Sequence, residues 1–95
     1  MNEIEFKKWM IKSGKNTKVI SDTISRIKKI ERELGCIEID DEYKKDQCSH
    51  LLSLFDNTGR NEQMNQFQTS LPIGKYSLST YKYAINLYIS FLSER

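Results

Sequence analysis

Apolar residues recur at helical spacing most clearly near the end of the chain, in residues 77–93. The apolar positions of this segment follow the helical pattern i, i+3, i+4, i+7, i+10 and i+11: Tyr81, Ala84, Ile85, Tyr88, Phe91 and Leu92. Such spacing gathers side chains on one face of a helix, which we expect Ser77 or Ser79 to cap. Tyr83 lies off this face and is expected to be partly exposed.

Two further helices are predicted in the first third of the sequence. The first is expected over residues 2–13, with Asn2 as its N-terminal cap and Gly14 after its end. The second is expected over residues 16–34, with Asn16 or Thr17 as its cap and Gly35 after its end. The expected apolar faces are Ile4, Phe6, Trp9 and Met10 in the shorter helix and Ile20, Ile24, Ile27 and Leu34 in the longer one. Glu31 falls inside the longer apolar face, so we expect its carboxylate to find a partner.

The middle of the chain is predicted to hold a connector, a third helix and a long loop. Residues 36–40 alternate like a strand, but a lone strand has nothing to pair with, so extended chain is expected. Residues 41–56 are predicted to form one helix, and the polar residues 57–75 an irregular loop. The chain is therefore expected to be all-α: a single domain of residues 1–95, built as a small four-helix bundle with one long loop before the last helix.

Composition and chemical inventory argue against an enzyme, a metal or a membrane protein. No apolar run reaches the ~18 residues of a membrane span, and two cysteines without a paired framework indicate a reduced, cytoplasmic protein. Cys36, Cys48 and His50 supply at best three ligands where a structural zinc takes four. The only histidine has no neighbour in the sequence that would orient it for nucleophilic catalysis. We expect a non-catalytic protein without metal or cofactor.

Charge is unevenly distributed along the chain. Residues 1–35 carry a net charge of +4, residues 36–66 of −4 and residues 67–95 of +2. Basic end segments of this kind attract a polyanion. The candidate DNA-binding residues lie along the second helix and at the start of the last one: Lys15, Lys18, Lys28, Lys29, Arg32, Lys75 and Lys82. If the ends of these helices pack together, the residues form one basic surface; otherwise they belong to ordinary solvated helix faces.

Several of these positions follow the pattern of a known family. Phe6 and Trp9 match its opening aromatic helix, Thr17 the start of its second helix, and Thr80, Tyr81, Ala84, Tyr88, Phe91 and Leu92 its closing helix. The chain resembles the SAM-like N-terminal core-binding domain of tyrosine recombinases and phage integrases, and the related helical module of restriction-type proteins. The resemblance implies a four-helix DNA clamp, with Lys15, Lys18, Lys29, Arg32 and Lys82 facing phosphates. The recombinase catalytic residues have no counterpart here, and the acidic residues 38–46 depart from a basic clamp.

Two functions therefore remain open. The first is a non-catalytic module that contacts the phosphates of duplex DNA, related to recombinase or restriction systems. The alternative is a small phage or mobile-element protein that acts as a protein–protein interaction module or inhibitor. It would use the acidic middle segment with Tyr83 and Phe67, because tyrosine is favoured in interface cores. A third, weaker hypothesis is a homodimer formed through Tyr83, Leu87 and Ser90.

Overall fold

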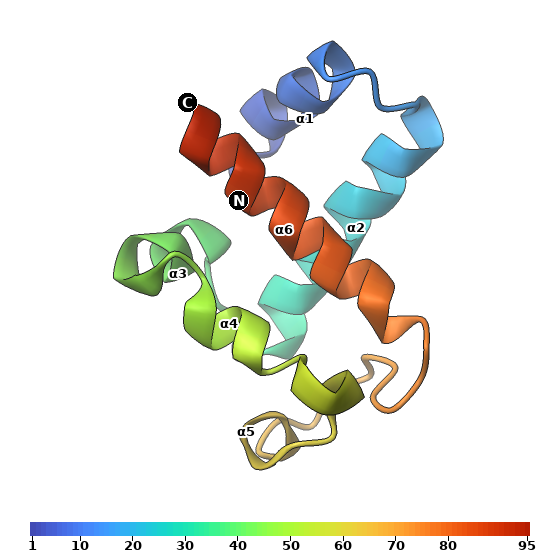
Figure 1. The fold of residues 1–95 in the computed structure, drawn as a ribbon, viewed down its shortest axis with the longest axis vertical. Helices are drawn as coiled ribbons and strands as arrows, with labels where there is room; N and C mark the ends of the chain where they lie inside the picture. Colours follow the sequence, from blue (N-terminus) through green and yellow to red (C-terminus); the bar gives the residue numbers. More distant parts are fainter.

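The computed structural model describes all residues 1–95 and contains helices but no strand (Figure 1). The elements are α1 (Glu3–Lys12), α2 (Thr17–Glu33), α3 (Ile39–Asp46), α4 (Ser49–Ser53), the 3₁₀ helix η1 (Asp56–Gly59), α5 (Glu62–Asn65) and α6 (Leu78–Glu94). The all-α class is confirmed, but there are six α-helices in place of the expected four. None of them has the length and apolar character needed to cross a membrane.

The two long helices, α2 and α6, pack across each other at the centre of the molecule, and α1 lies against both (Figure 1). The predicted apolar face of α2 is buried, and so is most of that of α6; Tyr81 is only partly buried. Where α1 meets the end of α6, rings from the two helices form an aromatic cluster: Phe6, Trp9, Tyr88 and Phe91. These rings explain how a helix as short as α1 is held, because tertiary packing replaces intrinsic helix stability.

The caps of the first two helices agree with the sequence. The side chain of Asn16 accepts a hydrogen bond from the backbone N–H of Val19 at 2.9 Å, and Asn2 accepts one from Glu5 at 3.5 Å. Gly14, with φ of +85°, ends α1 because a left-handed residue there costs glycine little. Each of these signals is local in the chain, so it is readable before the fold is known.

The predicted burial of Ile4 is wrong, because this side chain is 69% exposed. Phe6 and Met10 define the buried side of α1. Two residues along a helix correspond to a rotation of roughly 200°, so Ile4 points almost opposite to Phe6. A helix of ten residues with one contact side cannot bury both.

The predicted third helix is broken into α3 and α4. Gln47 and Cys48 both adopt left-handed backbone conformations, with φ of +57° and +66°. The break turns Cys48 into the core, where it is fully buried and its thiol donates to the carbonyl of Ile39. The start of α3 also differs from the prediction, since it begins at Ile39 and lacks a side-chain cap from its own N-cap residue. Glu31 of α2 accepts the hydrogen bond from the Ile39 N–H instead, at 3.0 Å.

The predicted long loop of residues 57–75 contains η1, α5 and buried anchors. Met64 and Leu71 are buried in the common core. The Asn61 side chain accepts from the Met64 N–H at 2.9 Å, which caps α5. The same side chain donates to the carbonyls of Leu54 at 3.0 Å and Asp56 at 2.8 Å, which ties α5 to the end of α4. Individual contacts of this kind order the segment. Its sequence has no periodic spacing of apolar residues that would predict a helix.

Buried polar groups join the starts of α1 and α3 to α6. The hydroxyl of Tyr88 accepts a hydrogen bond from the backbone N–H of Asn2 at 2.7 Å and donates one to Asp40 at 2.6 Å. Burial and the bond to Asp40 both raise the pKa of Tyr88. The α-amino group of Met1 contacts Glu31 at 3.0 Å, so the carboxylate inside the apolar face of α2 has the partner that its position required.

Candidate nucleic-acid interface

The side of α2 that faces away from the core carries cations and hydroxyl groups. Lys18, Ser25 and Arg32 are exposed and Lys29 is partly exposed. Ser21 lies beside them, one turn from Ser25, and is also exposed. Helical periodicity predicts this face directly, because these positions lie roughly opposite the buried isoleucines. We call these five residues the outer face of α2.

Two of the three carboxylates of α2 are held by contacts elsewhere. Glu31 binds Met1 and Ile39, as described above. Glu33 Oε1 accepts hydrogen bonds from the Ser70 N–H and hydroxyl and from the Thr69 hydroxyl. These bonds hold the pKa of Glu33 below its ordinary value of 4.5. Asp22 makes no ion pair with Lys18, so the pairing that their i, i+4 spacing allows is not formed.

Most cations of the chain are free of ion pairs. Of the fifteen lysine and arginine side chains, only two form one: Lys28 with Glu3 at 2.8 Å and Lys45 with Glu42 at 3.2 Å. The three cations of the outer face of α2 are therefore unpaired. An unpaired, hydrated cation can neutralise a phosphate without first breaking an ion pair of its own.

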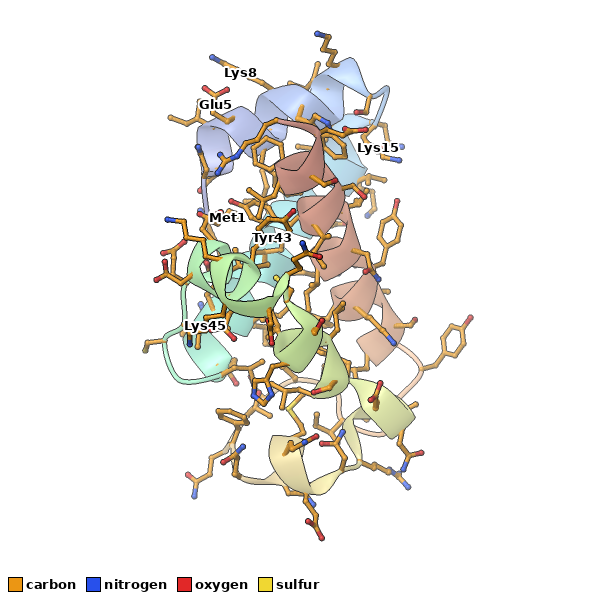
Figure 2. The ribbon with its side chains drawn as sticks, turned by 60° about the vertical axis from the view of Figure 1, so that its left-hand side comes forward. Met1, Glu5, Lys8, Lys15, Tyr43 and Lys45 are labelled. Atoms are coloured by element: carbon orange, nitrogen blue, oxygen red, sulfur yellow. The ribbon has the colours of Figure 1, made fainter.

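The remaining candidate cations lie at two places, Lys15 just before α2 and Lys75 and Lys82 near the start of α6. Lys15 lies in the turn between α1 and α2, and Figure 2 shows it on the opposite side of the view from Glu5 and Lys8 of α1. The start of α2 is at the upper right of Figure 1, whereas the start of α6, near Lys75 and Lys82, is at the lower right. The starts of α2 and α6 are therefore not packed together.

The structure also contains a groove between α1 and α2 that sequence reasoning missed. Its volume is about 450 Å³, and it is lined by Glu3, Lys7, Ile11, Thr17, Ile20, Ser21, Ile24, Ser25 and Lys28. The ion pair between Glu3 and Lys28 connects the two helices across it. In the structure, the 57% exposure of Ile11 marks this groove, and no local sequence pattern predicts that exposure.

The residues expected at a protein interface have different environments. Tyr83 is 48% exposed on α6, as predicted. Phe67 is partly buried against the core and lies close to Gly35, which leaves little of it free for a partner. Leu87 also packs against the core, so it does not belong to a separate outer face of α6. Tyr76 is 93% exposed and was not singled out by its sequence context.

The cysteines and the histidine lie in separate environments. Cys48 is buried, and burial together with nearby carboxylates raises the pKa of its thiol to about 12. Cys36 is exposed just after the end of α2, and His50 is exposed on α4. No three His, Cys, Asp or Glu side chains converge as a set of metal ligands.

Comparisons of the chain with family models, with curated proteins and with solved structures found no match. A function is therefore inferred from the chain's own geometry and charge. The outer face of α2 combines free cations with hydroxyl donors, which are the groups that contact a phosphate backbone.

Proposed function

We propose that this chain is a non-catalytic helical module of the SAM-like type that binds duplex DNA through its phosphates. The outer face of α2 is the contact surface, with Lys18, Lys29 and Arg32 as the phosphate ligands. Ser21 and Ser25 provide neutral donors between them. Such contacts give affinity and position, and they carry little information about base sequence.

One observation carries this proposal: the outer face of α2 keeps its cations free while Glu31 and Glu33 of the same helix are engaged elsewhere. Glu33 stays an anion near Arg32 and lowers the local positive potential, but it forms no salt bridge to a cation of this face. The nearby Asp22 is the one carboxylate of α2 not engaged elsewhere, and it moderates the field without cancelling three cations.

The dimensions of the outer face suit a duplex. Lys18 and Arg32 are fourteen residues apart, which corresponds to roughly 21 Å along an α-helix. That length matches about six base pairs at 3.4 Å per pair. Its three cations can neutralise about three of the phosphates on that length, which gives a modest, salt-dependent affinity.

The proposal is tested by fluorescence anisotropy of a labelled duplex of about 20 base pairs, titrated with the protein at a series of salt concentrations. We expect log K to fall linearly with log salt, with similar values for duplexes of unrelated sequence. Absence of binding at low salt refutes the proposal, and so does binding that does not respond to salt.

A further inference from the structure

Two large aliphatic side chains project into solvent from the same side of α1. Ile4 is 69% exposed and Ile11 is 57% exposed. They are seven residues apart, so they lie on one side of the helix with a separation of about 10 Å along its axis. Only two other large hydrophobic residues of the chain, Tyr76 and Tyr83, are exposed, and both have a polar hydroxyl. The pair on α1 is therefore the main exposed aliphatic surface of the molecule.

This aliphatic surface continues into the groove between α1 and α2. Ile11 lines the groove together with Ile20 and Ile24, which are buried core residues and form its apolar floor on α2. A partner that covers Ile4 and Ile11 thus reaches a groove of about 450 Å³ between the two helices, whose nine lining residues include three isoleucines. Shape and hydrophobicity together are typical of surfaces that receive one side of an amphipathic helix.

The charges beside this surface are mostly positive. Lys7 lines the groove, and Lys8 and Lys12 are exposed on the same helix; none of the three forms an ion pair. Figure 2 shows Lys8 extending away from α1 into solvent. The carboxylate of Glu3 is occupied by Lys28, so the exposed Glu5 is the one free carboxylate of α1, against three free lysines. A bound segment with carboxylates would therefore meet unpaired cations on α1.

We propose that Ile4, Ile11 and the adjoining groove, named here the α1 docking surface, bind an acidic amphipathic helix of another protein. The apolar side of that helix covers Ile4 and Ile11, and its carboxylates pair with Lys7 and Lys8. This site adjoins the outer face of α2 at Ser21 and Ser25, which also line the groove, but it uses none of the three cations of that face.

A second copy of this chain fits the surface less well than an acidic partner. A two-fold arrangement places Ile4 of one copy against Ile11 of the other, with the axis near residues 7 and 8. Lys7 and Lys8 of both copies then converge at that axis, and like charges in close contact weaken an interface. An acidic helix reverses the sign of this interaction.

The test uses a synthetic helix of about 18 residues built from Glu, Ala and Leu, with leucines at intervals of three and four on one side. Two control peptides replace the leucines by alanine or the glutamates by glutamine. Each is titrated into ¹⁵N-labelled protein and followed by amide chemical shifts. We expect the Leu/Glu peptide to shift residues of α1 and the groove, and both control peptides to bind at least about tenfold more weakly.

A protein variant completes the test. Ile4→Ser combined with Ile11→Ser changes only exposed side chains, so its thermal unfolding should match wild type, while peptide affinity falls at least about tenfold. No shift in α1 with the Leu/Glu peptide, or equal binding of the Leu→Ala peptide, overturns the proposal. A dimer mass in light scattering that the double variant reduces to a monomer assigns the surface to self-association and also overturns it.

A cross-check separates this site from the DNA interface. The Ile4→Ser/Ile11→Ser variant should keep duplex affinity, and a variant without Lys18, Lys29 and Arg32 charges should keep peptide affinity. If each variant loses both activities, the two surfaces are one and the docking proposal is refuted. If only duplex binding is absent from wild type, the proposed function fails while the docking surface stands.

Discussion

Removing the three free cations from the outer face of α2 should flatten the salt dependence of duplex binding. The variant is Lys18→Ala/Lys29→Ala/Arg32→Ala. Each phosphate contact on duplex DNA contributes about −0.9 to the slope of log K against log salt, because neutralisation releases condensed counterions. Loss of three contacts should therefore reduce the magnitude of the slope by about 2.7.

The same number sets the expected change in affinity. Between about 50 and 200 mM salt, a slope of 2.7 corresponds to roughly 40-fold in K. Over this salt range, K of the variant should fall by roughly 40-fold less than K of the wild type, and the variant should bind duplex more weakly at low salt. None of the three side chains makes an ion pair and none is buried, so unfolding free energy should change by no more than about 0.5 kcal/mol for each. Urea unfolding verifies that the fold is intact.

A matched control distinguishes local contacts from bulk charge. Lys12→Ala/Lys44→Ala/Arg60→Ala removes the same number of positive charges from exposed positions outside α2 that form no ion pair. Its slope should stay close to wild type. An equal loss of slope in both variants would refute the assignment of the contacts to α2, as would an unchanged slope in the first variant.

Three further predictions concern stability and reactivity. Tyr88→Phe removes a buried hydroxyl that both accepts and donates, and should cost about 1–3 kcal/mol of unfolding free energy in urea titrations; a loss below about 0.5 kcal/mol would contradict this. Glu33 has a lowered pKa, so its stabilising effect is present above pH 4.5 and is lost as the pH falls through the pKa of the folded state. The difference in unfolding free energy between wild type and Glu33→Gln should therefore shrink in acid, and a difference independent of pH would argue against this. In thiol titration at pH 8, Cys36 should react in the native protein and Cys48 only in denaturant, because the pKa of Cys48 is about 12; two rapidly reacting native thiols would disprove its burial.

The three principal helices were predictable from sequence because their determinants are local. Asn16 and Gly35 bound α2, and isoleucines at intervals of three and four choose its buried face. The same periodicity assigns Lys18 and Arg32 to the opposite face. The residues of the candidate DNA interface could therefore be predicted from the sequence. The hydrogen bonds of Glu33 to Ser70, 37 residues away, could not.

Tertiary structure decided the features that depend on single long-range contacts. Gln47 and Cys48 take up left-handed conformations without glycine, because turning the chain there buries Cys48 and lets its thiol donate to the carbonyl of Ile39. Asn61 orders a segment that has no periodicity at all. Periodicity reports what one helix does along its own axis. It says nothing of which sides meet, and so neither the exposure of Ile4 nor the groove beside α1 follows from it.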